Sequence, residues 1–541
     1  MADYSIIKEA SRIFNEVLLI DTGLSFPPEF VVAAKKVKFC GGDDQPFVLT
    51  PLKITESSAS LTALVATAGN VAAAERYGIG YQGVEVNLDV ATLFLESVLL
   101  PTIGGKPFVQ HTHMAKELAK MDIHNSAKPI RRYATNVYQT KDGRWYHLHG
   151  SMNAEPTMKM MDVQDIDVSP EDAIKIYADK VARWDSSEIE RVANEQFKQA
   201  GVICLTPEEF FSSEHGKIMA QEPLWTTTRL PAPRKPWPKT TDRQGCKPLA
   251  GIRILDVSRV IAAPAVSKIL SVLGADVLRV SCHRLPDYAA TMPDLQTGKR
   301  DTNLDLKTEE GRRVFTELVK GADILVDGYR PGALKRLGFD SQSLRELNPS
   351  LIYIRENCYG FKGPLAHRSG WQQISDCVVG LSYLQGKFLN LQEPVVPLLP
   401  NSDYQTGLAG AAAAIQSLIA RTKEDVTFDI DISLTQYNIW YYRLGLYSEE
   451  QQEKIRKRDP TFSPRHFDDM PVLVAKTHES CRRVRPDMFA HPEYFWEMSG
   501  QEYGLDENFL VLAPAFKFEK SHIAWEVPTG RRGRSKPEWV S

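Results

Sequence analysis

Asp403 stands just before a run of small residues, TGLAGAAAAI (406–415), that predicts a helix. A helix N-terminus stabilises an ionised carboxylate, and its free backbone N–H groups can also hold a developing oxyanion. Asp403 is therefore a candidate catalytic carboxylate. An ordinary N-cap residue, usually worth about 1 kcal/mol of stability, would occupy the same place. Position alone leaves both interpretations open.

Cysteine and glycine patterns disfavour two other chemistries. The seven cysteines are odd in number and widely spaced, without a Cys-x-x-Cys pair for zinc or redox work. A reducing, cytoplasmic setting fits them best. The turn VSRVIAAPA (257–265) stands where a dinucleotide-binding unit would have Gly-x-Gly-x-x-Gly, so a nicotinamide enzyme is disfavoured.

Composition excludes further classes. Of the 541 residues, 43% are hydrophobic and 25% charged, which is enough for two or more domains with proper cores. The net charge is only -3, and Lys and Arg are scattered, so neither nucleic acid nor an anionic membrane is an expected partner. No window reaches the ~18 consecutive apolar residues of a membrane helix. The N-terminus does not resemble a signal peptide.

Residues 250–356 supply the scaffold that precedes Asp403. Short apolar runs rich in β-branched residues alternate there with helical patterns, which predicts a doubly wound α/β domain around a parallel sheet. The Pro- and Lys-rich stretch 231–247 reads as a linker. It divides the chain into halves 1–230 and 248–541.

One internal similarity links the two halves. Residues 59–94 align without gaps on residues 405–440, each segment reading as an Ala-rich helix, a charged turn and an alternating strand. Asp403 then falls opposite Ser57, with Glu56 beside it. We therefore expect the N-terminal half to be catalytically silent.

Six motifs follow one another in the C-terminal half: LGADVLRV (273–280), TGKRDTNLDLKTEEGR (297–312), ADILVDGYRPGALKRLGF (322–339), LNPSLIY (347–353), YGFKGPLAHRSG (359–370) and NSDYQTGLAGAAAAI (401–415). Together with PLAGIRILDVSRVIAAP (248–264), they resemble the family III CoA-transferases. That family includes formyl-CoA transferase and carnitine CoA-transferase, and α-methylacyl-CoA racemase is a close relative.

The resemblance implies a reaction and a nucleophile. A family III enzyme moves CoA from an acyl-CoA to a carboxylic acid, and covalent catalysis divides this exchange into easier steps. Asp403 matches the aspartate that carries the acyl anhydride and then the CoA thioester. An acyl-CoA and a carboxylic acid are thus the expected partners, with CoA as a substrate and no tightly bound cofactor.

The N-terminal half resembles only the later part of the family. Residues 131–151 look like the entry to its small domain, whereas the CoA-binding unit is missing from this half; residues 441–541 look too short for a second small domain. Family members resembling this chain are interlocked homodimers. The complementary gaps predict an interlocked family III fold, as a homodimer or as a fused pseudo-dimer with one working site.

The resemblance also implies CoA contacts. Arg suits forked contacts to phosphate and Lys a point charge. The matching cations and pocket-lining residues are Lys299, Arg300, Arg336, Ala262, Tyr329 and Tyr359. Both tyrosines would equally fit a hydrophobic core.

Two departures from the family stand out. The acidic residue that often ends the second strand is replaced by Ser281, followed by Cys282 and His283, so the adenosine end of CoA would be held differently. The short segment GSMNAEP (150–156) has one glycine where formyl-CoA transferase has a flexible glycine-rich loop. Another element would then have to exclude water.

Two other functions remain open. In the racemases, a histidine in a Gly-His-Asp triplet serves as acid or base; here Gly370-Trp371-Gln372 takes its place, and His367 lies outside it. A non-catalytic acyl-CoA-binding protein is the other alternative, against which Asp403 in its motif argues. The substrate pair is not readable, because pocket residues such as Trp145, Tyr146 and His147 would come from the diverged half.

Overall fold

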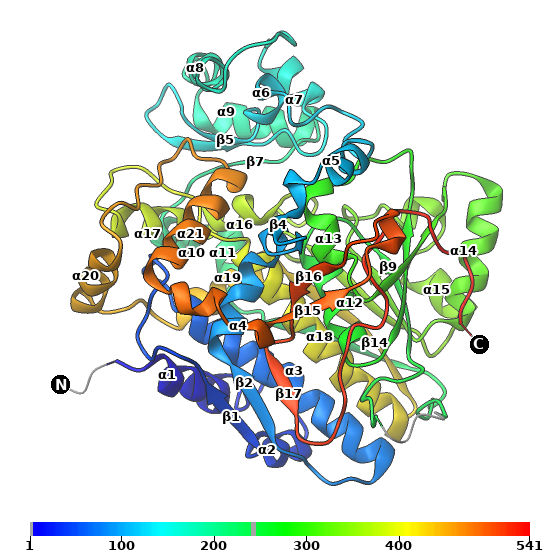
Figure 1. The fold of residues 1–541 in the computed structure, drawn as a ribbon. Coiled ribbons are helices and arrows are strands. Elements are labelled where there is room, and N and C mark those ends of the chain that lie inside the picture. Colours follow the sequence, from blue (N-terminus) through cyan, green and yellow to red (C-terminus); the bar gives the residue numbers. More distant parts are fainter. Residues whose placement is uncertain (1–3, 240–244, 541) are drawn as a thin grey trace.

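A seven-stranded sheet forms the centre of the C-terminal half in the computed structural model, which describes residues 4–239 and 245–540 (Figure 1). The strands lie in the order β11 (Lys299–Asn303), β10 (Asp276–Ser281), β9 (Arg253–Val257), β12 (Ile324–Asp327), β13 (Ile352–Asn357), β14 (Val426–Ser433) and β8 (Trp225–Pro231). All pairs are parallel except β14 with β8. The chain leaves β9 in both directions, as in a doubly wound sheet. The predicted α/β class is confirmed.

Both faces of this sheet are buried. Ile254 of β9 belongs to the same apolar core as α12 (Ala262–Val272) and α18 (Asn401–Lys423). Its neighbour Leu255 belongs instead to the core beneath α14 (Glu309–Gly321). Because successive side chains of a strand point to opposite faces, a doubly covered strand needs an unbroken apolar run. The unbroken apolar runs seen in the sequence of residues 250–356 are explained by this burial on both faces.

The repeated segment has the same structure in both halves. In the N-terminal half, α3 (Ile54–Tyr77) leads into β2 (Val84–Asn87) and α4 (Leu88–Leu93). In the C-terminal half, α18 leads into β14 and α19 (Leu434–Arg443). The two long helices pack against each other (Figure 1). Small residues such as Ala and Gly allow this close approach and explain the composition of both helices.

Each half gives its last strand to the other half. β8, at the end of the N-terminal half, pairs antiparallel with β14, so that Trp225 lies opposite Ile432. β17 (Phe516–Phe518), near the end of the C-terminal half, pairs antiparallel with β2, so that Phe516 lies opposite Val86. The halves are therefore interlocked within one chain, and the predicted fused pseudo-dimer is confirmed.

A small domain interrupts the N-terminal half. Its sheet contains β5 (Asn136–Gln139), β6 (Trp145–Leu148) and β7 (Gly201–Ile203), and α8 (Pro170–Val181) and α9 (Ser186–Arg191) complete a separate apolar core. It lies at the top of Figure 1. The expected entry at 131–151 coincides with β5 and β6.

The second small-domain region is shared between the halves. β15 (Phe495–Met498) and β16 (Phe509–Leu512) form a four-stranded sheet with β3 (Thr102–Ile103) and β4 (Lys106–Pro107) from the N-terminal half. The stretch 231–247 thus joins two interlocked halves rather than two separate bodies. Part of it, 240–244, lies outside the described residues.

The C-terminal segment returns to the edge of the main sheet. The backbone N–H groups of Gly533 and Ser535 donate to Asp301 Oδ1 and Asp301 O, at 2.6 and 2.8 Å. Trp539 Nε1 donates to Leu318 O at 3.0 Å. Edge strand β11 is therefore covered by residues about 230 positions later in the chain.

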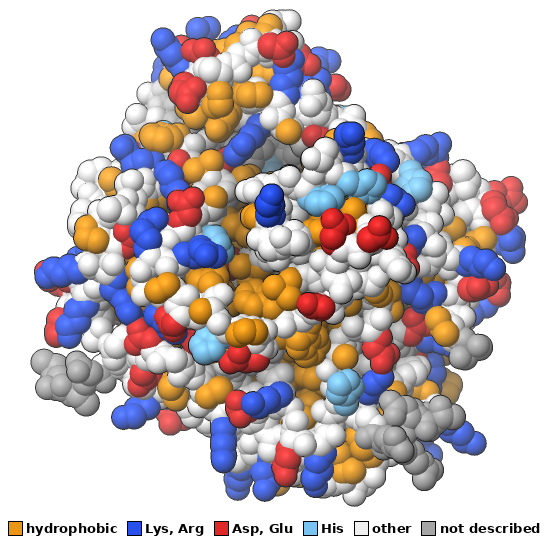
Figure 2. All heavy atoms as spheres, viewed as in Figure 1, with side chains coloured by type: hydrophobic (Ala, Val, Ile, Leu, Met, Phe, Trp, Pro, Cys, Tyr) orange, Lys and Arg blue, Asp and Glu red, His pale blue; other side chains and the backbone are white. Residues whose placement is uncertain are grey.

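Charged side chains of both signs are interspersed over the face shown in Figure 2, without a continuous patch of one sign. This matches the small net charge. Among the described residues, no helix combines the length and apolar character needed to cross a bilayer.

Candidate active site

A cavity of about 400 Å³ lies between the large and small domains. One side comes from the carboxyl ends of β12 and β13 and from the first turns of α12 and α18. The small-domain segment 151–156 lines the other side. Ligands of doubly wound proteins bind at this edge of the sheet, because the loops there diverge and leave a crevice.

Asp403 lies in the first turn of α18 and lines this cavity. It is not the N-cap residue: Pro400 holds that position and no side chain caps the helix. Burial, together with the charges of Glu356 and Asp376, raises the pKa of Asp403 well above its usual value. Among the described residues, no hydrogen bond or ion pair engages its carboxyl group, which is left to meet a ligand.

Hydrogen bonds hold the start of α18 in place. Asp376 Oδ1 accepts from Asn438 Nδ2 at 2.8 Å and from Ser402 Oγ at 3.3 Å. Asn401 Nδ2 donates to the Tyr437 hydroxyl at 2.9 Å. Burial raises the pKa of Asp376 to about 7. The neighbours of Asp403 in the chain, Ser402 and Tyr404, are both buried. The backbone that carries Asp403 is therefore held in place.

Glu356 is a second acidic residue that lines the same cavity, at the end of β13. Burial and the charge of Asp327 raise the pKa of Glu356 to about 8. Sequence reasoning missed this residue. The available signal was its place at the carboxyl end of a predicted parallel strand, where functional side chains gather.

Three guanidinium groups also line the cavity, and Arg368 among them is paired with Glu190 and Glu195, whereas Arg259 and Arg330 are not paired with a described carboxylate. Arg259 lies over the ring of Tyr329, 4.9 Å from its centre, and its Nη1 donates to Pro286 O at 2.8 Å. Arg330 Nη1 donates to Lys198 O at 3.1 Å. Neither forms an ion pair with a described carboxylate. Both are available to an anionic ligand, and both were missed from the sequence.

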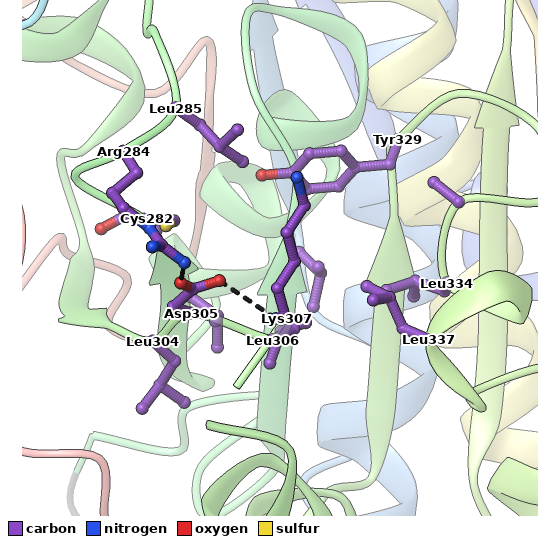
Figure 3. A pocket seen from close by; sticks show the side chains of 14 residues that line it. Cys282, Arg284, Leu285, Leu304, Asp305, Leu306, Lys307, Tyr329, Leu334 and Leu337 are labelled. Carbon is purple, nitrogen blue, oxygen red and sulfur yellow. Dashed lines mark hydrogen bonds and ion pairs between the residues drawn. The ribbon is translucent and has the colours of Figure 1, made fainter. Parts of the chain in front are cut away.

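A second cavity of about 250 Å³ adjoins the first through Tyr329, which lines both (Figure 3). Leucine side chains dominate its walls, with Lys307 reaching toward Tyr329 in this view, while Arg284 forms an ion pair with Asp305. Such a slot suits a flat, largely apolar group with a charged substituent at its edge. The remaining aliphatic lining residues are Val257, Val280, Leu285, Leu304, Leu306, Ala333, Leu334 and Leu337.

Comparisons with known proteins identify the family of this chain. The model of CoA-transferase family III matches residues 249–493. "Acetyl-coenzyme A transferase nodX" of Hypoxylon pulicicidum is 33% identical over 561 residues, covering 99% of this chain and 94% of its own. The chain belongs to CoA-transferase family III.

Further relatives of this transferase carry similar names. An "Acyl-CoA transferase" of Gibberella moniliformis is 29% identical, covering 90% of this chain and 88% of its own. Among solved structures, a CAIB/BAIF family protein from Brucella suis is 26% identical with a TM-score of 0.31, covering 40% of this chain and 60% of its own.

Three predicted CoA contacts of the transferase lie at the two cavities. Ala262 starts α12 and lines the larger cavity, and Tyr329 lines both. Arg336 is exposed on the short turn whose neighbours Leu334 and Leu337 line the smaller cavity. No described residue forms a side-chain ion pair with Arg336, so its guanidinium is free to meet a phosphate.

The other three predicted contacts lie elsewhere. Lys299 is fully buried, where its Nζ contacts Asp256 Oδ2 at 2.9 Å and Pro264 O at 2.7 Å. Arg300 forms a forked ion pair with Asp276 at the opposite end of the sheet. Tyr359 is buried in the core. β11 begins at Lys299, whose side chain points inward.

The two departures from the family also have a structural counterpart. Ser281 Oγ donates to Asp301 Oδ1 at 2.7 Å, and Cys282 lines the smaller cavity. The segment 151–156 does form part of the cavity wall despite its single glycine, and Trp371 Nε1 donates to Ser151 Oγ at 3.4 Å. The segment 151–156 can therefore help to exclude water from the cavity, a role that the sequence leads us to expect of another element.

The position of the racemase histidine is filled by a different ring. Trp371 lines the cavity and stacks on His149, with ring centres 5.4 Å apart. His367 instead contacts Glu195 Oε1 at 3.0 Å, near the surface. The racemase arrangement therefore lacks its imidazole at this position.

The matching site of the N-terminal half is closed. Glu56 is fully buried and accepts hydrogen bonds from the hydroxyl groups of Tyr4 and Tyr447, at 2.7 and 2.8 Å. Ser57 Oγ donates to Ile54 O at 3.1 Å. The side chains opposite Asp403 are thus packed in a core rather than around a cavity.

Proposed function

We propose that this family III enzyme moves CoA from an acyl-CoA donor to a carboxylic acid acceptor through covalent intermediates on Asp403. The observation that carries the proposal is an unpartnered carboxyl group in the first turn of α18, open to a cavity between the two domains. Free N–H groups of that turn favour a carboxylate and can bind an oxyanion.

The proposed reaction has two halves. The Asp403 carboxylate attacks the thioester carbonyl, which gives a mixed anhydride and releases CoA. The CoA sulfur then attacks the Asp403 carbonyl, which gives an aspartyl thioester and frees the donor acid. An acceptor acid reverses both steps. Because the overall reaction exchanges one CoA thioester for another, it is nearly thermoneutral.

CoA has a natural path along the two cavities. The smaller cavity would take adenine beside Tyr329, with Arg336 and Lys307 near the phosphates, and the thiol end would pass Ala262 toward Asp403. Arg259 and Arg330 would meet the diphosphate or the carboxylate of the second substrate. Lys299 and Arg300 are not proposed as direct contacts.

One relative is named an acetyl-coenzyme A transferase, so acetyl-CoA is the first donor to test, followed by succinyl-CoA. A panel of small carboxylic acids would then identify the acceptor.

Trapping of the covalent intermediate tests the proposal. The enzyme is mixed with acetyl-CoA or succinyl-CoA and hydroxylamine, and its peptides are measured by mass spectrometry. We expect a hydroxamate on Asp403. Sustained CoA transfer without any modification of Asp403 would overturn the proposal, because the reaction would then proceed without a covalent aspartyl intermediate.

A further inference from the structure

Glu356 has no part in the chemistry described so far. Its carboxyl group lines the same cavity as Asp403, and it has no side-chain hydrogen bond or ion pair with any described residue. Its neighbour Arg355 points to the other side of β13, where it forms a forked ion pair with Asp431. A buried carboxyl group without a partner is costly unless it is neutral or meets a ligand. Glu356 therefore faces the substrate space.

The groups around Glu356 favour its neutral form. Asp327, at the end of the adjacent strand, accepts hydrogen bonds from the Tyr353 hydroxyl and the Tyr329 N–H, at 2.8 and 3.0 Å. Its negative charge and burial together raise the pKa of Glu356 to about 8. The other charged or titratable groups that line the cavity are His124, Lys198, Arg259, Tyr329, Arg330, Cys358, Arg368 and Asp403.

Asp403 and Glu356 line the same cavity, and the negative charge of Glu356 is one of the causes that raise the pKa of Asp403. Two nearby carboxyl groups disfavour the ionisation of both at once. Asp403 lies at a helix N-terminus, which stabilises a negative charge, whereas Glu356 lies beside the charge of Asp327. We assign the charge to Asp403, because the helix N-terminus favours it there, and the proton to Glu356. Asp403 then serves as the nucleophile and Glu356 as an acid that lines the same cavity.

We propose that Glu356 is a second catalytic residue, a neutral carboxylic acid that protonates the CoA sulfur as it leaves and takes the proton back when the sulfur attacks. This proposal rests on the proposed function of Asp403. When the bond from Asp403 to the acyl carbon forms and the carbon–sulfur bond breaks, sulfur takes the Glu356 proton. When sulfur then bonds to the Asp403 carbonyl carbon, its proton returns to Glu356 and the donor acid leaves as a carboxylate.

The acidities of the two partners are matched. A free thiol has a pKa of about 8.5, and the pKa of Glu356 is raised to about 8. Proton transfer is efficient in both directions when donor and acceptor have similar pKa values near the working pH. An ordinary glutamate would be ionised at neutral pH and could not protonate the leaving sulfur.

The test compares Glu356→Gln with Glu356→Asp, and with Glu346→Gln as an exposed control. Turnover with acetyl-CoA or succinyl-CoA is expected to fall about 10²- to 10⁴-fold in Glu356→Gln, the usual size of general acid–base catalysis. Glu356→Asp, which keeps a carboxyl group, should retain part of the turnover that Glu356→Gln loses. Thermal unfolding shows whether Glu356→Gln is folded.

A second substrate separates a proton donor from a structural residue. The acetyl ester of thiophenol releases a more acidic thiol that leaves without a proton. The rate at which this ester acylates Asp403, measured by the release of thiophenol, should stay within about threefold of the wild-type rate in Glu356→Gln. Wild-type turnover of CoA esters should also decline above pH 8, and Glu356→Gln should lack this decline.

Three results would overturn the inference. Glu356→Gln could keep CoA turnover within about threefold of wild type, it could lose acylation equally with both thioesters, or the decline above pH 8 could persist in it. If the wild-type enzyme itself forms no Asp403 adduct, the proposed function fails first. A Glu356→Gln enzyme that is slow with CoA esters but still traps the Asp403 hydroxamate would support both proposals.

Discussion

Lys299 Nζ lies 2.9 Å from Asp256 Oδ2, and both side chains are completely buried. The same ammonium group donates to Pro264 O, which ties β11 to α12 at the turn that borders the larger cavity. We therefore expect Lys299 to support the cavity from behind rather than to bind a ligand itself.

Lys299→Ala should destabilise the protein without a specific loss of CoA affinity. Removal of the ammonium leaves Asp256 buried and uncompensated, which costs roughly 3–5 kcal/mol. Urea unfolding measures this cost, with exposed Lys335→Ala as the control. A stable Lys299→Ala protein with much weaker CoA binding would restore the original expectation of a phosphate contact.

Asp403→Ala should abolish transfer and leave CoA binding largely intact, because the proposed nucleophile is lost but the phosphate contacts remain. Asp403→Asn should behave likewise unless slow deamidation restores activity. Steady-state transfer and calorimetric CoA binding measure the two effects. Activity within tenfold of wild type, about 1.4 kcal/mol of barrier, contradicts the assignment.

Arg336→Ala should weaken CoA binding by one to two orders of magnitude, since a hydrogen bond to a charged group is worth ~1.5–3 kcal/mol. The loss should be smaller with dephospho-CoA if Arg336 holds the 3′-phosphate. Titration with both ligands measures this, and Lys335→Ala, one residue earlier and equally exposed, is the matched control. Unchanged affinity for both would make Arg336 an ordinary surface residue.

The two halves should not work apart, because each completes the sheet of the other. Residues 248–541 expressed alone leave β14 without β8 and β17 without β2, and thus expose apolar edges that promote aggregation. We expect an insoluble or inactive fragment, and partial recovery of activity on co-expression with 1–230. A soluble 248–541 fragment with full activity would refute this.

One chain should bind one CoA. Among the described residues, the side chains around Glu56 are packed in a core and do not line a cavity like that of Asp403. Calorimetry with light scattering gives the stoichiometry per chain and the size of the particle. Two CoA molecules bound per chain would contradict the single-site pseudo-dimer.

Glu56→Gln should stabilise the protein at alkaline pH. Burial raises the pKa of Glu56 from 4.5 to about 7, so its contribution to stability is fully present below pH 4.5 and is lost as pH rises through 7. Chemical unfolding from pH 5 to 8 should show a smaller decline for Glu56→Gln than for wild type, while exposed Glu16→Gln should show none of this change. Identical slopes would indicate an ordinary pKa for Glu56.

The sequence by itself determined the main sheet, the repeat and the family. Apolar runs around Ile254 and Leu255 required a strand buried on both faces, and local spacing is sufficient to recognise such a strand. Asp403 could be selected because it belongs to an ordered series of motifs. These features depend on residues close together in the chain.

Only the tertiary structure decided which side chains reach the cavity. Lys299 and Lys307 lie in one motif, yet Lys299 is buried at the start of β11, whereas Lys307, in the turn after that strand, lines the smaller cavity. The register of the strand sets the direction of the Lys299 side chain. Glu356 and Asp403 are 47 positions apart, and the pairing of β13 with β14 brings the end of β13 beside the start of α18. The exchange of β8 and β17 is equally unreadable locally, since an antiparallel partner is chosen by packing and register across the whole fold.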